Sequence, residues 1–288
     1  MKPLNTLSQK TLYRLLGLLL ALPCASLVTN QGQAATLDPG YRALDAENTL
    51  VIDTSRGRVV VEMYPQLAPS HVERMKTLAR KHFYDNQKFH RVIEGFMAQT
   101  GDPTGTGEGG SDLPNLNAEF SIRRGSDFPL AVTAKPVDMV YGYLAAMPMA
   151  SQTDDLMAIT KDAKVPAWGE FCQGVLGMAR AGDANSANSQ FFLMRGANSN
   201  LERKYTAFGA VVSGLDVVKK LKIGEPPKDP DMMLKVQVLA DMPEKDRPNI
   251  EVMDTKSTEF MTLVTLAKKR LGDNITSCDV SVPSKILP

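Results

Sequence analysis

The sequence predicts a mainly β protein whose short antiparallel strands form a closed or sandwiched structure. Three observations predict this fold class. Short runs rich in β-branched and aromatic residues recur along the chain, and only two helical patterns lie among them. A parallel sheet would need a helix between most successive strands, and the pattern does not provide those helices.

The predicted elements begin with a hairpin and a helix. The β-rich runs 50–53 and 59–64 are separated by the turn sequence 54–58. Pro69 suits the first turn of a helix, and apolar residues then recur at helical spacing, at Val72, Met75, Leu78, Ala79 and Phe83. The other predicted elements are a second helix around 214–222 and strands at 89–93, 96–100, 175–179, 190–194, 208–212 and 236–239.

Three segments lack this succession of short strand and helix patterns. Residues 35–48 are a polar lead-in, and residues 121–172 contain Pro, Met and aromatic residues without a sustained period. The tail 241–288 contains one predicted helix, which Ser257 can cap and Gly272 can end. The basic run 268–270 falls in its last turn, where cations complement the helix dipole. The apolar stripe of this helix consists of Phe260, Leu263, Val264, Ala267 and Leu271.

The N-terminus has the pattern of an export signal. Cations at Lys2, Lys10 and Arg14 precede the apolar stretch 15–28, which is shorter than a bilayer-spanning helix. Small residues follow up to Ala34, so we predict a signal peptide over 1–34 with cleavage after Ala34. An uncleaved anchor is the alternative. The mature chain is then expected to be periplasmic or secreted, with no stable insertion in a membrane.

Composition sets limits on the class of partner. The 288 residues are 43% hydrophobic, which is enough for a sizeable core. Without the three cations of 1–34, 30 Lys and Arg face 32 Asp and Glu. This balance gives no electrostatic footprint for nucleic acid or for an acidic membrane.

The cysteine count is compatible with one disulfide. Cys24 leaves with the signal peptide, so Cys172 and Cys278 remain in the mature chain. An even pair in an exported protein favours a bond between them. Two unpaired buried thiols are the alternative.

Two dense segments carry the chemistry. The first spans 89–102 and reads FHRVIEGFMAQTGD; the second begins at 174–181 as GVLGMARA and continues at 188–192 as NSQFF. Together they closely resemble the two signature segments of cyclophilins, which are peptidyl-prolyl cis/trans isomerases. The order of elements is also similar from residue 49 to residue 240, interrupted by an insertion at about 121–172. The resemblance implies an eight-stranded closed antiparallel barrel capped by two helices, followed by the helical tail.

The resemblance implies that Arg91 and Gln99 are catalytic. Rotation about an X-Pro bond breaks no covalent bond, so the site must bind the twisted amide more tightly than the planar one. Arginine suits this task because it stays charged and presents several donors in a fixed fork. Without the surrounding motif, Arg91 would be taken for a strand residue that faces solvent or pairs with an acid.

The resemblance also implies a substrate pocket. An apolar socket for the proline ring would be lined by Phe96, Met97, Phe192 and Leu201, although each of these could instead be an ordinary core residue. Gln190 would orient Arg91 or Gln99, or serve as a core amide partner. Gln99 and the backbone of Ala179 and Arg180 are implied to hold the substrate chain, and Tyr205 could offer a hydroxyl at the edge of the pocket.

The segment 198–205 departs from the family pattern. Asn200 falls where many eukaryotic members have tryptophan, and Tyr205 falls where they have histidine. The tryptophan matters chiefly for cyclosporin, so we expect weak cyclosporin binding. Trp168 lies in the insertion and cannot be assumed to replace it.

Other motifs do not point to a cofactor. Gly105, Gly107 and Gly110 have the spacing of a dinucleotide fingerprint, but Pro114 follows where a helix is needed, so a loop beside the site is expected. The histidines lack local metal spacing, and the cysteines form no CxxC pattern. We therefore expect no metal and no cofactor. The expected partners are unfolded or folding polypeptides that contain X-Pro bonds; a client-binding chaperone or interaction module on the same scaffold is the alternative.

Overall fold

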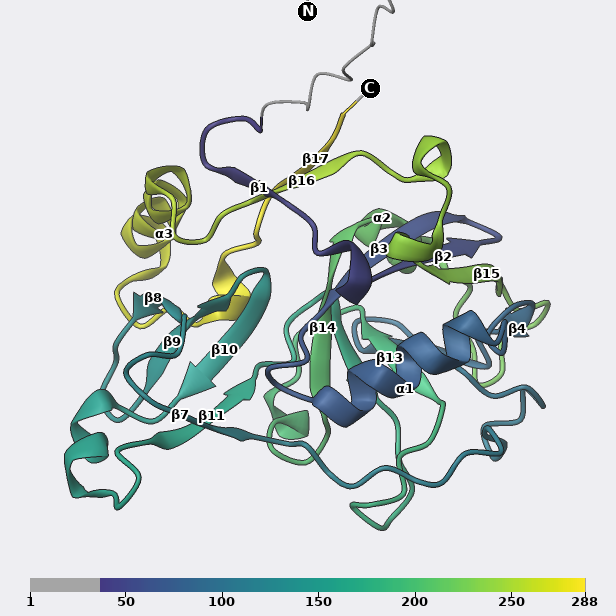
Figure 1. Ribbon diagram of the computed structural model, residues 1–288, viewed down its shortest axis with the longest axis horizontal. Coiled ribbons are helices and arrows are strands. Elements are labelled where there is room, and N and C mark those ends of the chain that lie inside the picture. The colour runs from purple at the N-terminus through teal and green to yellow at the C-terminus, as the bar shows by residue number, and fades with distance from the viewer. Residues whose placement is uncertain (1–36, 288) are drawn as a thin grey trace, which may run out of the picture. The chain divides into compact units, whose positions relative to one another are not determined.

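The computed structural model describes residues 37–287, in which three antiparallel sheets carry most of the regular structure (Figure 1). The predicted signal peptide, 1–34, lies outside the described residues. No helix within 37–287 is both long enough and apolar enough to cross a membrane.

The largest sheet has nine strands and positions the signature segments. In spatial order the strands are β4 (Gln87–Lys88), β15 (Met232–Val238), β2 (Thr49–Thr54), β3 (Gly57–Met63), β14 (Ala207–Ser213), β12 (Val175–Met178), β13 (Phe191–Met194), β6 (Met97–Thr100) and β5 (Arg91–Ile93). The prediction of a mainly β antiparallel fold is confirmed, but the prediction of an eight-stranded closed barrel is wrong.

The reason lies between β4 and β5. These two edge strands are separated in the chain by Phe89 and His90 only. Up to Lys88 the chain pairs with β15, and from Arg91 onward it pairs with β6. The predicted strand 89–93 is therefore shortened to β5, and the separate strand β4 precedes it with a different partner, so the curled sheet keeps two edges.

Two helices pack against the core of this sheet. They are α1 (Pro69–Arg80) and α2 (Leu215–Lys220). Burial of apolar side chains such as Met75 and Val218 joins the helices to strand residues such as Ile52 and Phe208. The prediction extended the first helix to Phe83. The structure ends it at Arg80, because His82 adopts a positive φ of 55° and breaks the helical path.

Residues 121–172 form a sheet that the sequence did not predict. Its strands, in spatial order, are β7 (Ile122–Arg124), β11 (Val165–Gly169), β10 (Met147–Ser151), β9 (Val140–Leu144) and β8 (Ala131–Ala134). All five residues of β10 are buried, so the strand shows no alternation of apolar and polar residues. Met147 and Met149 are fully buried and serve in packing.

The lead-in and the tail meet in a third sheet. Its strands are β1 (Tyr41–Ala43), β16 (Ile250–Met253) and β17 (Ser284–Ile286). Between the last two lies helix α3 (Thr258–Leu271), which Ser257 caps by accepting from the backbone N–H of Phe260 at 3.1 Å. Leu271 was expected in the apolar stripe but is 52% exposed, at the open end of the helix.

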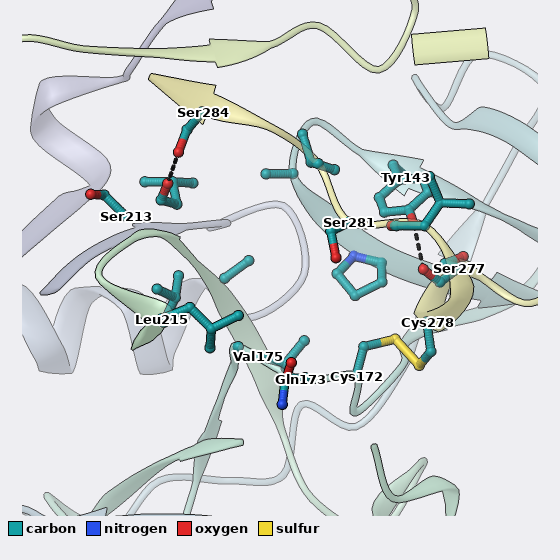
Figure 2. A pocket seen from close by; sticks show the side chains of 18 of the residues that line it. Tyr143, Cys172, Gln173, Val175, Ser213, Leu215, Ser277, Cys278, Ser281 and Ser284 are labelled. Carbon is teal, nitrogen blue, oxygen red and sulfur yellow. Dashed lines mark hydrogen bonds between the residues drawn. A yellow bond between two sulfur atoms is a disulfide. The ribbon is translucent and has the colours of Figure 1, made fainter. Parts of the chain in front are cut away.

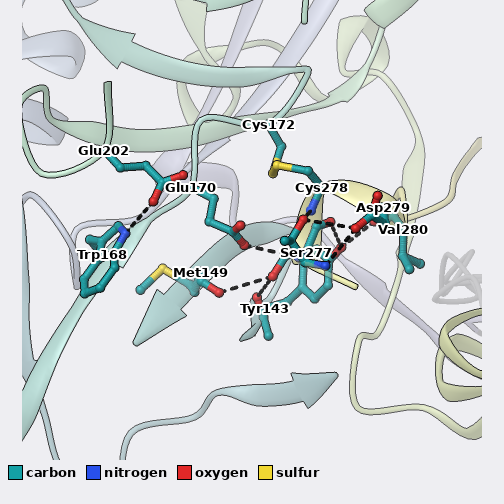
Figure 3. The surroundings of a disulfide bond; sticks show 12 residues. Tyr143, Met149, Trp168, Glu170, Cys172, Glu202, Ser277, Cys278, Asp279 and Val280 are labelled. Carbon is teal, nitrogen blue, oxygen red and sulfur yellow. Dashed lines mark hydrogen bonds between the residues drawn. A yellow bond between two sulfur atoms is a disulfide. The ribbon is translucent and has the colours of Figure 1, made fainter. Parts of the chain in front are cut away.

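The tail packs against the five-stranded sheet and is joined to the chain before β12. Phe260 of α3 meets Tyr143 of β9 edge to face at 5.2 Å between ring centres. The Tyr143 hydroxyl donates to the carbonyls of Ser277 and Val280. A disulfide connects Cys278 to Cys172 (Figure 3), so the predicted bond is confirmed.

Candidate functional site

Arg91 lies at the edge of the nine-stranded sheet, opposite Gln99 on the neighbouring strand. Its Nε donates to Oε2 of Glu225 at 2.6 Å, and its Nη1 donates to Oε1 of Gln99 at 3.5 Å. The guanidinium carbon lies 6.0 Å from the ring centre of Phe96. These bonds hold the cation in a defined orientation. The side chain is 40% exposed, so the cation still reaches solvent.

A chain of amides continues from Arg91. Gln99 Nε2 donates to Oε1 of Gln190 at 2.9 Å. Gln190 Nε2 in turn donates to the carbonyls of Gly107 and Gly109, both at 2.8 Å. This sequence of bonds fixes the Gln99 amide so that its oxygen faces Arg91. Gln190 therefore contacts Gln99 and not Arg91.

The glycine-rich segment beside these amides is a loop around a buried carboxylate. Asp102 is 1% exposed and accepts hydrogen bonds from the backbone N–H groups of Thr104, Thr106, Gly107 and Gly109. Burial alone would raise the pKa of Asp102, but bonds from Thr104, Gly107 and Gly109 outweigh it and lower the pKa to about 2. The glycines with dinucleotide-like spacing, Gly105, Gly107 and Gly110, therefore lie in a loop, as expected.

Two cavities border the amide chain. One, of about 520 Å³, is lined by Arg91, Gln99, the loop 105–107 and the pair Glu225–Pro226. The other, of about 590 Å³, shares Gln99 and Gly107 with the first and includes Gln190, Ala179 and Arg180 in its lining. Polar groups predicted to hold a substrate chain therefore share one region with Arg91.

The apolar residues predicted for the pocket belong to one cluster. Met97 and Phe192 are 2% and 5% exposed, and Phe96, Ala179, Leu201 and Tyr205 are partly buried against them. Gln99 and Phe192 are direct partners on adjacent strands. The cluster therefore lies next to the amide chain.

Aromatic contacts shape this cluster. Phe192 meets Tyr205 edge to face at 6.1 Å between ring centres and stacks on Phe171 at 5.8 Å. The Arg180 guanidinium lies 4.6 Å from the ring centre of Tyr205, and its Nε donates to the carbonyl of Lys204 at 2.9 Å. Arg180 is thus folded onto the loop that carries Tyr205.

Sequence reasoning missed Glu225 and Phe171. Glu225 is 134 residues from Arg91 in the chain and belongs to neither signature segment. It arrives beside Arg91 because Val92 and Gly224 exchange both backbone hydrogen bonds, at 2.8 and 2.9 Å. Phe171 precedes Cys172, and nothing in its local pattern indicated contact with Phe192.

Among residues 37–287, one group of potential metal ligands is close enough to share an ion. It consists of Glu170, Cys172 and Cys278. The two sulfurs are bonded to each other, so they cannot act as thiolate ligands.

Known proteins resemble this chain in sequence and in fold. The sequence model described as cyclophilin type peptidyl-prolyl cis-trans isomerase/CLD matches residues 49–239. A probable peptidyl-prolyl cis-trans isomerase of Brucella suis is 36% identical over 215 residues, which are 69% of this chain and 86% of that protein. The peptidyl-prolyl cis-trans isomerase-like 1 protein of Aspergillus fumigatus is 33% identical over 172 residues, 60% of this chain and 80% of that protein.

A solved structure agrees with these sequence matches. The crystal structure of cyclophilin AquaCyp293 from Hirschia baltica superposes with a TM-score of 0.79 at 35% identity, covering 86% of this chain and 93% of that one. The family match spans both signature segments and the strands that carry them. The chain is a member of the cyclophilin family of peptidyl-prolyl cis-trans isomerases.

Proposed function

We propose that this isomerase acts on X-Pro bonds of exported polypeptides by non-covalent stabilisation of the twisted amide, with Arg91 as its principal catalytic residue. The observation that carries the proposal is the guanidinium of Arg91, held by Glu225 and Gln99 beside the apolar cluster. Amide resonance sets a barrier of about 20 kcal/mol to rotation. As the amide twists, its nitrogen becomes pyramidal and gains a lone pair that a guanidinium N–H can engage.

The remaining residues position the substrate. The apolar side chains of Phe96, Met97, Phe192 and Leu201 receive the proline ring. The backbone N–H of Ala179 already donates to the carbonyl of Gln190 at 2.9 Å, so Ala179 offers its own carbonyl to the substrate chain. Gln99 orients Arg91, and Gln190 orients Gln99. Arg180 and Tyr205 form the outer wall.

The test is a protease-coupled isomerisation assay with X-Pro peptides. The purified chain is expected to accelerate cis-to-trans conversion, and the Arg91→Ala variant is expected to lose most of that acceleration. A folded variant with full activity would remove Arg91 from the mechanism.

Weak inhibition by cyclosporin is a further expected result. Asn200 is exposed on a short 3-10 turn, Ser199–Leu201, and offers no indole at that position. Trp168 is 6% exposed, and its indole N–H donates to Glu202 at 2.8 Å, which leaves that donor occupied. Asn200→Trp is expected to tighten inhibition roughly tenfold or more, because a buried indole is a strong interface anchor. An inhibition titration measures this, and tight binding by the wild type would contradict it.

We further propose that the chain is exported and cleaved after Ala34, which supports exported polypeptides as its clients. The cationic start, the apolar stretch 15–28 and the small residues before Ala35 support this proposal. The residues 121–172 and 241–288 are then additions to an isomerase domain at 49–240. Mass spectrometry of the chain recovered from a secreting host is the test. A chain that begins at Ala35 agrees with the proposal, whereas a chain that retains Met1 rejects it.

A further inference from the structure

A buried carboxyl group lies beside the disulfide. Glu170 is 3% exposed, and one of its oxygens lies within 4.8 Å of the sulfurs of both Cys172 and Cys278 (Figure 3). Its carboxylate accepts one hydrogen bond, from the backbone N–H of Ser277 at 3.2 Å. None of the ion pairs formed within 37–287 includes Glu170.

This carboxyl group has no cation to neutralise it, and burial of an unpaired carboxylate costs several kcal/mol. Burial is the main cause that raises the pKa of Glu170 to about 8, and the charges of Glu202 and Asp279 add to it against the bond from Ser277. Tyr143, which also faces this carboxyl group, has its own pKa raised by burial and by Glu170. Glu170 is therefore mostly a carboxylic acid at neutral pH and can donate a proton.

The disulfide is accessible from a cavity. Cys172 and Cys278 both line a cavity of about 550 Å³ between β12, β14 and the tail, together with Gln173 and Ser281 (Figure 2). Cys172 is 6% exposed, and Cys278 is the less buried of the two. A small thiol in this cavity therefore reaches the sulfur of Cys278 more readily than that of Cys172.

We propose that Cys172–Cys278 is a thiol–disulfide exchange site for small dithiols, with Glu170 as its acid–base residue. A thiolate of the dithiol attacks Sγ of Cys278 and forms a mixed disulfide. The Cys172–Cys278 bond breaks, and Sγ of Cys172 leaves with the electron pair and takes the proton of Glu170. The second thiol, deprotonated by water, attacks the mixed disulfide and releases Cys278, which takes a proton from water. The dithiol is oxidised to a cyclic disulfide and the protein disulfide is reduced to two thiols.

The structure around the disulfide favours its reoxidation as well as its reduction. The Cys278 loop keeps other attachments, because the Ser277 hydroxyl donates to the carbonyls of Gly142 at 2.9 Å and Met149 at 3.2 Å. A capping box between Thr276 and Asp279 fixes the turn itself. After reduction the two sulfurs therefore stay close together, which gives the high effective concentration that reoxidation needs. In that direction the Glu170 carboxylate takes the proton from Cys172.

The experiment compares the rates at which dithiothreitol reduces the disulfide of the wild type and of variants of the full mature chain. The pH ranges from about 6 to about 9. The reaction is quenched with acid, and the free thiols are then counted. Glu170→Gln keeps the size and the acceptor for Ser277 but cannot donate a carboxyl proton. It is expected to slow reduction roughly tenfold or more at neutral pH. The ratio of wild-type to variant rates should approach one above a pH of about 8, because Glu170 is then ionised. Glu202→Gln is the matched control. It removes a neighbouring charge that adds to the raised pKa of Glu170 but keeps the Glu170 carboxyl group, so its rate should stay within about threefold of wild type.

Equal rates for wild type and Glu170→Gln across this range would overturn the proposal, as would equal slowing in Glu202→Gln. Should Glu170→Gln fail to fold, the wild type alone is decisive. Its rate constant per dithiothreitol thiolate must fall as pH rises through about 8, and a flat profile rejects the role of Glu170.

Discussion

Arg91→Ala is expected to lower kcat/KM for an X-Pro peptide by about one to three powers of ten, or about 1.4–4 kcal/mol of transition-state stabilisation. The variant loses the guanidinium that Glu225 and Gln99 hold beside the apolar cluster. Within residues 37–287 no other guanidinium is bonded to both of these side chains. Arg91→Lys keeps the charge but loses the planar fork, so only partial activity is expected.

Stability should change little in these variants. Arg91 is 40% exposed, and its ion pair with Glu225 is of the solvent-exposed kind that stabilises by about 0–1 kcal/mol. Arg123→Ala is the matched control, because Arg123 is 45% exposed and pairs with Asp162 outside the candidate site. Its kcat/KM should equal that of the wild type. A loss of activity equal to that of Arg91→Ala would indicate a general effect of removing a surface cation.

Reduction of the disulfide is expected to cost up to about 4 kcal/mol of unfolding free energy, because the bond closes a loop of 106 residues. This corresponds to a fall in Tm on the order of 10 °C. Most isomerase activity should remain at moderate temperature, since neither cysteine belongs to the amide chain around Arg91.

The measurement is thermal unfolding with and without reductant. A double Cys172→Ser, Cys278→Ser variant is the control, since its Tm should not respond to reductant. Thiol titration of the unfolded, unreduced chain should find no reactive thiol. Two thiols per mature chain would show that the bond does not form in the protein as isolated.

Local patterns were sufficient to predict most elements of the nine-stranded sheet. Most of its strands coincide with predicted runs rich in β-branched and aromatic residues, and both helices coincide with helical spacing. The two-residue strand β4 was not predicted. Strands β12 and β13 are buried at every position, so their composition and not an alternation marked them. The five-stranded sheet could not be predicted in this way. In β10 every side chain is buried, and Pro148 interrupts the β-rich character, so neither alternation nor propensity marks the strand.

The same contrast holds at the candidate site. Arg91, Gln99 and Phe192 are neighbours across adjacent strands, so the motifs that resemble the family also place them together. Glu225 could not be predicted, because its contact with Arg91 depends on a bridge between Val92 and Gly224 that no local pattern encodes. The disulfide was predictable from counting, whereas Glu170 beside it required the tertiary structure.

The two edges of the curled sheet offer little backbone for pairing with another chain. An exposed strand edge can template pairing with another extended chain and start aggregation. Here the edge strands β4 and β5 have two and three residues, and Val92 in the second is already bonded to Gly224 on both backbone groups. Along this sheet an extended polypeptide therefore finds almost no free backbone to pair with. In the proposed function the client is bound in the pocket beside Arg91 and not as an added β-strand, which favours its release.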